Sequence, residues 1–439
     1  MDVEGAPQSY CSTKVVFILF GVASLLGWNA LLTELDFFNL FLPSMKPYVS
    51  FGFLNYILNI VFQFILVWKK TIMPMKVQLI VSILGSITFL IIIPMFTMIL
   101  EKDSSFNRIF TGGLVILMGF INALCSGGFF SLVSNFPLEM IVSLSAGQGL
   151  SGIAMNILQY IVLVSIPLKT FDKGTSEEII EKEKEKVYSI RAWIFFGVSS
   201  FILLICLLLL FVSYNTTYFQ YYLNKTNDKK ETTTPIDSAA EGENIKEEQF
   251  SLTTEEVPIQ NAGRTASFGY LFYRLWDLDF LILYTYIVTF ALFPNASISQ
   301  QLFTLKDSFN SNTIILTYNL FDTIGRYLVA KVKPTKQLNM IIILGRSILL
   351  FTIVFNFYAQ LKLEENESHL ITSISLLINV ALLAATNGIG TTLCFGIAPN
   401  EVEDEFKGQA GGSLSFFLIL GIFLGNCVAF GTEAIIGTF

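Results

Sequence analysis

The stretch IFFGVSSFILLICLLLLFVS, residues 194–213, contains twenty residues and no charged side chain. A helix of that length rises about 30 Å, which is the thickness of the hydrocarbon core of a bilayer. Similar apolar runs recur along the chain, which is 53% hydrophobic and 14% charged, whereas soluble proteins carry about 25% charged residues. The runs do not alternate apolar and polar residues, as the strands of a membrane barrel do. The sequence therefore predicts an all-α integral membrane protein.

About eleven segments are expected to cross the membrane. They cover residues 15–35, 50–68, 77–100, 109–133, 145–167, 191–213, 276–294, 311–331, 338–360, 371–395 and 413–436. The first of them lacks a small-residue cleavage site, so we interpret it as a span and not as a signal peptide. The net charge of −7 is small and lies largely in loops, which gives no argument for nucleic-acid binding.

One long hydrophilic segment, residues 214–270, divides the spans into six and five. It has few aromatic or branched apolar residues, so it cannot bury enough surface to fold, and it is predicted to be a disordered cytoplasmic loop. Residues 1–213 then form an N-terminal six-helix bundle and residues 271–439 a C-terminal five-helix bundle. Two such bundles are typical of transporters that rock one half against the other around a central site.

Basic residues in short connectors predict the orientation. The connectors after the second and eighth spans carry Lys69, Lys70, Lys76, Lys331, Lys333 and Lys336. Both are expected to be cytoplasmic, which places the N-terminus in the cytoplasm and the C-terminus outside. The connector at 168–190 argues against this orientation, because its lysines would face outward among glutamates. Asn366, in an NES sequence of a predicted outer loop, is the expected glycosylation site.

Charged and polar residues inside the spans are the candidate functional residues, since each needs a partner or a water-filled cavity. Asn319, Asp322 and Arg326 are spaced +3 and +7, which places them within about 60° on one helical face. They are interpreted as a polar stripe facing a central cavity, with Asp322 and Arg326 offering fixed donors and acceptors. The alternative is a self-neutralised pair that only fixes helix packing.

Two further spans contain amides and small residues. Gln148 is flanked by Gly149 and Gly152, and these glycines predict close helix packing, while the amide of Gln148 can bond across helices or to a solute. Asn122 and Ser126 lie one turn apart in the preceding span and have the same character.

Trp28, with Leu25 and Leu32 on either side of it, is either an interface anchor or a flat apolar wall for a planar ligand. Asn387 and Gly388 are expected to loosen their helix locally. Arg346 lies about two turns into the bilayer and is expected to snorkel to the cytosolic surface, as a structural or inner-gate contact.

Catalytic and metal-binding patterns do not emerge. The single histidine, His369, lies in a polar connector, and the five cysteines mostly fall inside apolar spans without metal-ligand spacing. There is no P-loop and no nucleophile with a base. The sequence therefore predicts neither an enzyme nor a cofactor.

Several motifs, taken together and in order, resemble those of the equilibrative nucleoside transporter family. They are LLGWNALLTELDFF, SAGQGLSG, FALFP, YNLFDTIGRYL, ATNGIGTTLCFGIAP and GGSLSFFLILGIFLG. The resemblance implies an eleven-span fold related to the major facilitator architecture and facilitative transport of nucleosides, in some members of nucleobases or with proton coupling. It also implies a small nucleoside as the substrate, the lipid bilayer as the surroundings, and no cofactor. We expect a monomer in the plasma membrane.

The resemblance also assigns expected roles to residues. Trp28, Leu25 and Leu32 would wall the base, and Asp322 and Arg326 would contact the ribose hydroxyls with Asn319 nearby. The residues expected to serve gating or packing are Asn29, Gly149, Gly152, Arg346, Asn387 and Gly388. Gln148 is a candidate both for substrate binding and for packing.

This chain departs from the family pattern at two positions. Gly27 stands where many members have proline, and Ser126 stands where a glutamine often helps to read the base. Asn122, one turn earlier, is a candidate substitute for that glutamine. The alternative functions are a major-facilitator carrier of sugars or another small metabolite, which should show a twelfth span, and a membrane enzyme or structural protein.

Overall fold

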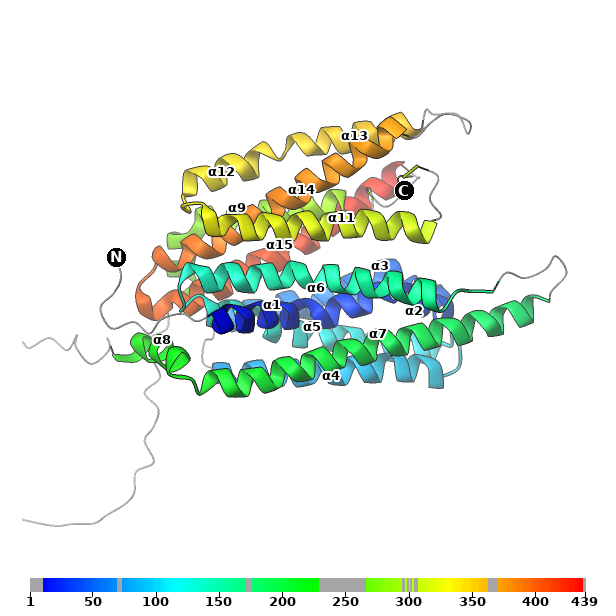
Figure 1. Ribbon diagram of the computed structural model, residues 1–439, viewed down its shortest axis with the longest axis horizontal. Helices are drawn as coiled ribbons and strands as arrows, with labels where there is room; N and C mark the ends of the chain where they lie inside the picture. Colours follow the sequence, from blue (N-terminus) through cyan, green and yellow to red (C-terminus); the bar gives the residue numbers. More distant parts are fainter. Residues whose placement is uncertain are drawn as a thin grey trace, which may run out of the picture.

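The computed structural model describes residues 11–68, 73–169, 176–228, 266–293, 297, 300, 302–303, 307–361 and 370–436. Within these ranges the regular elements are helices (Figure 1). The N-terminal half contains α1 (Cys11–Thr33), α2 (Leu35–Phe41), α3 (Pro47–Trp68), α4 (Met75–Ile99), α5 (Ser105–Val133), α6 (Leu138–Ser165), α7 (Glu177–Tyr214) and α8 (Thr217–Asp228). The C-terminal half contains α9 (Phe268–Leu292), α11 (Asp307–Leu328), α12 (Lys336–Gly345), α13 (Ile348–Leu361), α14 (Leu370–Ile397) and α15 (Lys407–Ile436).

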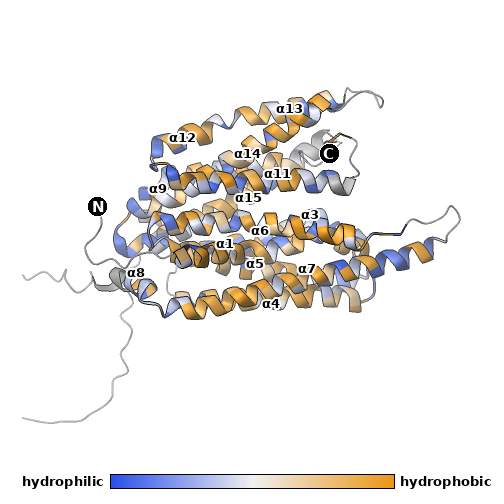
Figure 2. Cartoon of the chain, in the orientation of Figure 1, coloured by the Kyte–Doolittle hydropathy of each residue, from blue (hydrophilic) through white to orange (hydrophobic). Residues whose placement is uncertain are grey.

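Each of the eleven expected spans falls on a helix, with α12 and α13 together occupying the ninth. Ten of these helical segments of the described chain are long and apolar enough to cross a membrane by composition. Helix α11 is the exception, because its 22 residues include many polar side chains. Apolar residues dominate most of the helices (Figure 2), and many large ones are exposed, as expected for contact with lipid tails.

The helices pack in two groups. Helices α1 and α3–α7 form one group, in which α1 lies on α6 and α5 lies on α3 and α4. Helices α9 and α11–α15 form the other, in which α9 lies on α15 and α11 on α14. The two groups meet along α6 and α11 and along the contacts of α15 with α3 and α5 (Figure 1).

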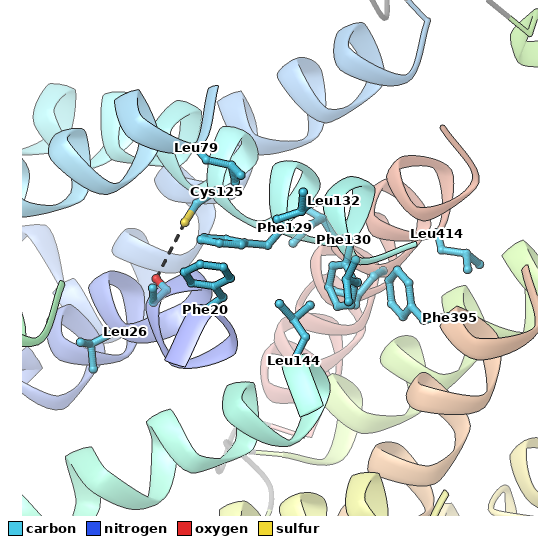
Figure 3. Packing of buried hydrophobic residues seen from close by; sticks show 14 of the residues in the cluster. Phe20, Leu26, Leu79, Cys125, Phe129, Phe130, Leu132, Leu144, Phe395 and Leu414 are labelled. Atoms are coloured by element: carbon cyan, nitrogen blue, oxygen red, sulfur yellow. Dashed lines mark hydrogen bonds between the residues drawn. The ribbon is translucent and has the colours of Figure 1, made fainter. Parts of the chain in front are cut away.

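The two ends of this assembly differ. We call the end where α1 finishes and α11 begins the open end, which lies at the right in Figure 1, and the opposite end the closed end. At the closed end the rings of Phe130 on α5 and Phe395 on α14 stack with centroids 3.6 Å apart. Ser131 Oγ donates to the Gly408 carbonyl over 2.8 Å, which joins α5 to the start of α15. Figure 3 shows Phe130, Leu144, Phe395 and Leu414 filling the space between the helices, so this end is sealed by packed side chains.

Two segments outside the expected spans are partly helical. The charged sequence EEIIEKEKEKVYSIR, expected in a connector at 168–190, belongs to α7, which begins at Glu177. Arg191 is the last residue of this charged sequence. Its guanidinium is buried and donates two hydrogen bonds to the Ile166 carbonyl. The connector at 168–190 is therefore helical from Glu177 onward, and this helix continues into the sixth expected span.

Helix α8 occupies the start of the segment 214–270 that was expected to be disordered. Phe219 stacks on Phe17 of α1 with centroids 5.3 Å apart and also contacts Phe136. The aromatic residues just after α7 thus bury apolar surface against the closed end. Most of the remaining segment lies outside the described residues, as do Asn366 and His369.

Candidate functional site

A cavity of about 880 Å³ lies between the two groups of helices and reaches the open end. All of the residues expected to bind substrate line it: Leu25, Trp28, Leu32, Asn122, Ser126, Gln148, Asn319, Asp322 and Arg326. Of the residues expected to serve gating or packing, Asn29, Gly149, Gly152 and Asn387 also line it, whereas Arg346 and Gly388 lie outside its wall. The polar stripe of α11 thus faces the cavity and not lipid.

The charged pair of α11 is buried and fully oriented. Arg326 is 4% and Asp322 5% exposed, and Arg326 Nε donates to Asp322 Oδ2 over 2.7 Å. The second carboxylate oxygen accepts from Asn387 Nδ2 over 2.8 Å, and Arg326 Nη1 donates to Gln148 Oε1 over 3.0 Å. Removing either charged partner would leave the other charge buried and uncompensated.

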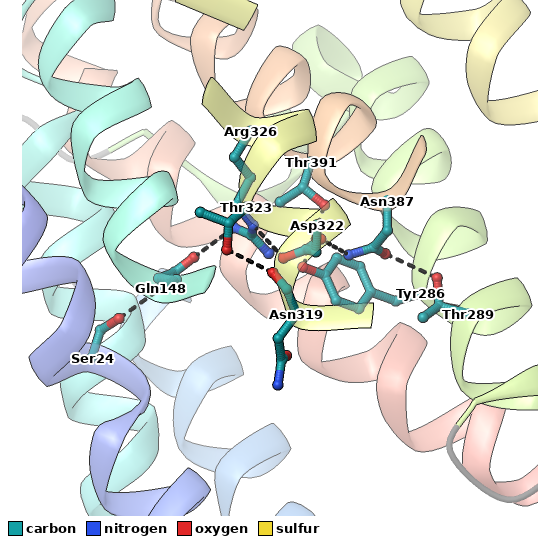
Figure 4. A network of polar contacts seen from close by, with 10 residues as sticks. All are labelled: Ser24, Gln148, Tyr286, Thr289, Asn319, Asp322, Thr323, Arg326, Asn387 and Thr391. Carbon is teal, nitrogen blue, oxygen red and sulfur yellow. Dashed lines mark hydrogen bonds and ion pairs between the residues drawn. The ribbon is translucent and has the colours of Figure 1, made fainter. Parts of the chain in front are cut away.

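This pair belongs to a chain of hydrogen bonds that crosses both groups of helices (Figure 4). On one side, Gln148 Nε2 donates to Ser24 Oγ over 3.1 Å, which reaches α1. On the other side, Thr289 Oγ1 donates to Asn387 Oδ1 over 2.9 Å, which reaches α9. None of the described residues accepts a hydrogen bond from Arg326 Nη2, and Arg326 lines the cavity.

Arg346 does not snorkel to a surface. Its side chain is 2% exposed and donates to the carbonyls of Thr285 and Leu383 and to Thr289 Oγ1, over 3.1, 3.1 and 2.7 Å. The expectation was wrong because carbonyl and hydroxyl groups of α9 and α14 accept hydrogen bonds from Nη1 and Nη2 of the guanidinium inside the C-terminal group. Arg346 therefore ties α9 and α14 together at the break between α12 and α13.

Asn387 and Gly388 do not loosen their helix, since α14 is continuous from Leu370 to Ile397. A Cβ at Gly388 would lie 2.1 Å from the Asp322 carbonyl oxygen, so this glycine permits the close approach of α11 and α14. Gly149 and Gly152 have the same effect between α6 and α11. A Cβ at Gly149 would lie 2.2 Å from Thr323 Oγ1, and one at Gly152 would lie 2.5 Å from the side chain of Asn319.

Gly388→Ala is expected to lower thermal stability, because relieving the overlap with α11 costs about 1–3 kcal/mol. The matched control is Gly197→Ala on α7, where a Cβ would meet nothing within 4 Å. The apparent melting temperature of purified protein in detergent measures both. A Gly388→Ala protein as stable as the control would contradict the packing role.

Aromatic and apolar side chains form the remaining wall. The rings of Trp28 and Tyr56 lie 5.8 Å apart at an angle of 62°, and those of Phe293 and Tyr318 stack at 4.1 Å. Trp28 therefore faces the cavity, which favours the wall over the interface anchor. Asn29 donates to Ser151 Oγ over 3.0 Å and holds α1 on α6.

The sequence interpretation missed several cavity residues. These are chiefly Asn55, Tyr56 and Asn59 of α3, Asn156 of α6, Tyr286 of α9 and Tyr318 of α11. For α3 a signal was present, because Asn55, Asn59 and Gln63 follow one another at four-residue intervals and so share a helical face. The tyrosines carry no such signal, since their rings suit packing equally well.

Comparison with known proteins identifies relatives across the whole chain. The family model described as "Nucleoside transporter" matches residues 113–434. Equilibrative nucleotide transporter 1 of Arabidopsis thaliana is 23% identical, over 98% of this chain and 88% of the relative. Equilibrative nucleoside transporter 1 of Homo sapiens is 20% identical, over 99% of this chain and 100% of the relative.

Solved structures show the same fold in major facilitator transporters. A proton:xylose symporter superposes with a TM-score of 0.63 at 11% identity, over 97% of this chain and 88% of that one. The E. coli fucose:proton symporter superposes with a TM-score of 0.57 at 15% identity, over 98% of this chain and 94% of that one. The fold is therefore of the major facilitator type, and since the family model matches well over half of its length, the chain belongs to the nucleoside transporter family.

Proposed function

We propose that this membrane transporter carries nucleosides down their gradient by alternating access. The observation that supports this most directly is the oriented Asp322–Arg326 pair at a cavity whose wall also contains aromatic and apolar side chains. A nucleoside is neutral and has hydroxyl groups at one end and a flat base at the other. Such a ligand suits a mostly apolar pocket with a few converging polar groups.

The sugar hydroxyls are assigned to the α11 side of the cavity. Arg326 Nη2 offers a free donor there, and the bonds to Asp322 and Gln148 hold the guanidinium in place. Trp28 and its neighbour Leu25 are assigned to the face of the base. The network needs no rearrangement when the cavity is empty, because each charge then neutralises the other.

Uptake of labelled adenosine or uridine into vesicles containing the purified protein tests the proposal. Unlabelled nucleosides should compete and free bases should compete more weakly. A sugar carrier is the second candidate, favoured by the fold likeness to the xylose and fucose symporters. Competition by hexoses, with no specific uptake of any nucleoside or base, would replace the proposal by that candidate.

Trp28→Ala is expected to raise the KM for nucleoside uptake about tenfold with little change in maximal rate, because an aromatic contact to the base is lost. Trp193 on α7 is a matched control, since it is 40% exposed and lies outside the cavity wall. Concentration-dependent initial rates measure both variants. An unchanged KM in Trp28→Ala would remove the tryptophan from the binding wall.

In the proposed orientation the N-terminus lies in the cytoplasm and the C-terminus outside. The protein is proposed to be a monomer in the plasma membrane. The orientation is supported by the positions of α3 and α11, whose ends lie next to the basic connectors. Both ends lie at the closed end, together with the start of α1 (Figure 1). The cavity then opens to the outside. Uptake that does not change with external pH would distinguish simple facilitation from proton coupling.

A further inference from the structure

The wall of the cavity formed by α3 carries amide side chains that the sugar-binding assignment does not use. Asn55 and Asn59 both line the cavity and are 1% and 2% exposed. They lie one helical turn apart on the same face of α3, in the N-terminal group of helices, whereas the charged pair lies on α11 in the C-terminal group. Neither belongs to the sequence motifs that pointed to a binding site.

These amides are incompletely bonded. Asn55 Oδ1 accepts from Asn122 Nδ2 over 3.3 Å, but Asn55 Nδ2 has no partner among the described residues. Asn59 Oδ1 also lacks a donor there. Buried amide groups are nearly always hydrogen-bonded, and one left unpaired destabilises the empty protein. A ligand that bonds to these groups recovers that free energy.

The unpaired groups are complementary in kind, one a donor and the other an acceptor. The ring of Tyr56, between them in sequence, lies 5.8 Å from that of Trp28 and both line the cavity, so the cavity offers aromatic faces as well as the amides. A nucleobase combines these requirements, since its faces are apolar and its edge carries donors next to acceptors. A sugar ring has hydroxyl groups but no flat face.

We propose that Asn55 and Asn59 read the hydrogen-bonding edge of the base, and that Asn122 holds the Asn55 amide in position. This rests on the proposed function and adds the base subsite to it. Four residues of helix rise about 6 Å, so the two amides match the longer edge of a purine, where a 6-amino donor lies between two ring-nitrogen acceptors. Purine nucleosides with a polar group at position 6 are therefore the preferred substrates.

Competition against labelled adenosine uptake tests this, with adenosine, purine riboside and uridine as unlabelled competitors. Purine riboside lacks the 6-amino group but keeps the ring and the sugar. In the unaltered protein, adenosine should compete about tenfold better than purine riboside, as expected for one hydrogen bond to a buried group. In Asn59→Leu and in Asn55→Leu this preference should fall to about twofold or less.

Thermal stability separates recognition from a structural role. Asn59→Leu loses no hydrogen bond of the empty protein and removes an unpaired buried acceptor, so its melting temperature should be unchanged or higher. Added adenosine should then raise that temperature less than in the unaltered protein. The matched control is Asn426→Leu on α15, where the amide donates to a carbonyl of its own helix outside the cavity wall. It should keep the adenosine preference.

If purine riboside competed as well as adenosine in the unaltered protein, the proposed base subsite would be overturned. This comparison uses the unaltered protein alone, so it does not depend on whether a variant folds. A folded Asn59→Leu protein that keeps the tenfold preference would overturn it too. In both cases labelled adenosine is still transported, so the proposed function stands. A complete lack of adenosine and uridine uptake would instead overturn the proposed function and the subsite with it.

Discussion

Arg326→Ala is expected to abolish nucleoside uptake. The substitution removes the donors assigned to the sugar and the bonds to Asp322 and Gln148. A hydrogen bond from a charged group contributes about 1.5–3 kcal/mol, so losing two such contacts predicts a fall in uptake of more than about 100-fold. Initial rates of labelled nucleoside uptake, normalised to protein in the vesicles, measure it.

A second variant separates transport from folding. Arg326→Ala also leaves the Asp322 carboxylate buried without its cation, which can itself destabilise the protein by about 3–5 kcal/mol. The double variant Asp322→Asn with Arg326→Gln removes both charges and keeps side chains of similar size. It should remain folded, with a melting temperature near that of the unaltered protein, and transport nothing. Substantial uptake by this double variant would mean that the pair serves packing alone.

A disulfide across the closed end is expected to block transport completely and reversibly. A Cβ at Gly412 on α15 would lie 3.3 Å from Ser131 Oγ on α5. A disulfide places each Cβ about 3 Å from the sulfur of its partner, so this distance is close to the one that a bond between Ser131→Cys and Gly412→Cys needs. Alternating access requires this end to open, and the bond prevents it. Uptake should vanish after oxidation and return after reduction.

The background for this experiment replaces the exposed thiols Cys11 and Cys427 with serine. Each single cysteine variant is a control and should transport equally well under oxidising and reducing conditions. Mass spectrometry establishes that the crosslink has formed. Undiminished uptake by a fully crosslinked protein would show that α5 and α15 need not separate, and alternating access through the closed end would be abandoned.

The positions of the spans were predictable because a bilayer imposes a length and an apolar composition that can be read without tertiary information. The stripe of Asn319, Asp322 and Arg326 was predictable for the same reason, since charge inside an apolar segment has few permitted surroundings. The partners of these residues were not, because Gln148 and Asn387 are distant in sequence and meet Arg326 and Asp322 through helix packing alone.

Other differences have separate physical causes. Arg346 was expected to reach water because acceptors from α9 and α14 cannot be foreseen from its own helix. The start of α7 at Glu177, well before the sixth expected span, was not predicted, because the pairing of Glu185 with Lys102 cannot be foreseen from its own segment. Asn55 and Asn59 were overlooked because isolated amides in an apolar run change its hydropathy little.

The polarity of α11 has a consequence for how the protein is made. A charged residue opposes insertion of an isolated segment into the bilayer by about 2.5–3.5 kcal/mol at the centre of the segment, and by less near its end, where Arg326 lies. Helix α11 carries Asp322 and Arg326 and is too polar to qualify as a span on its own composition. We therefore expect its entry into the membrane to depend on helices α6 and α14, which pack against its polar side chains.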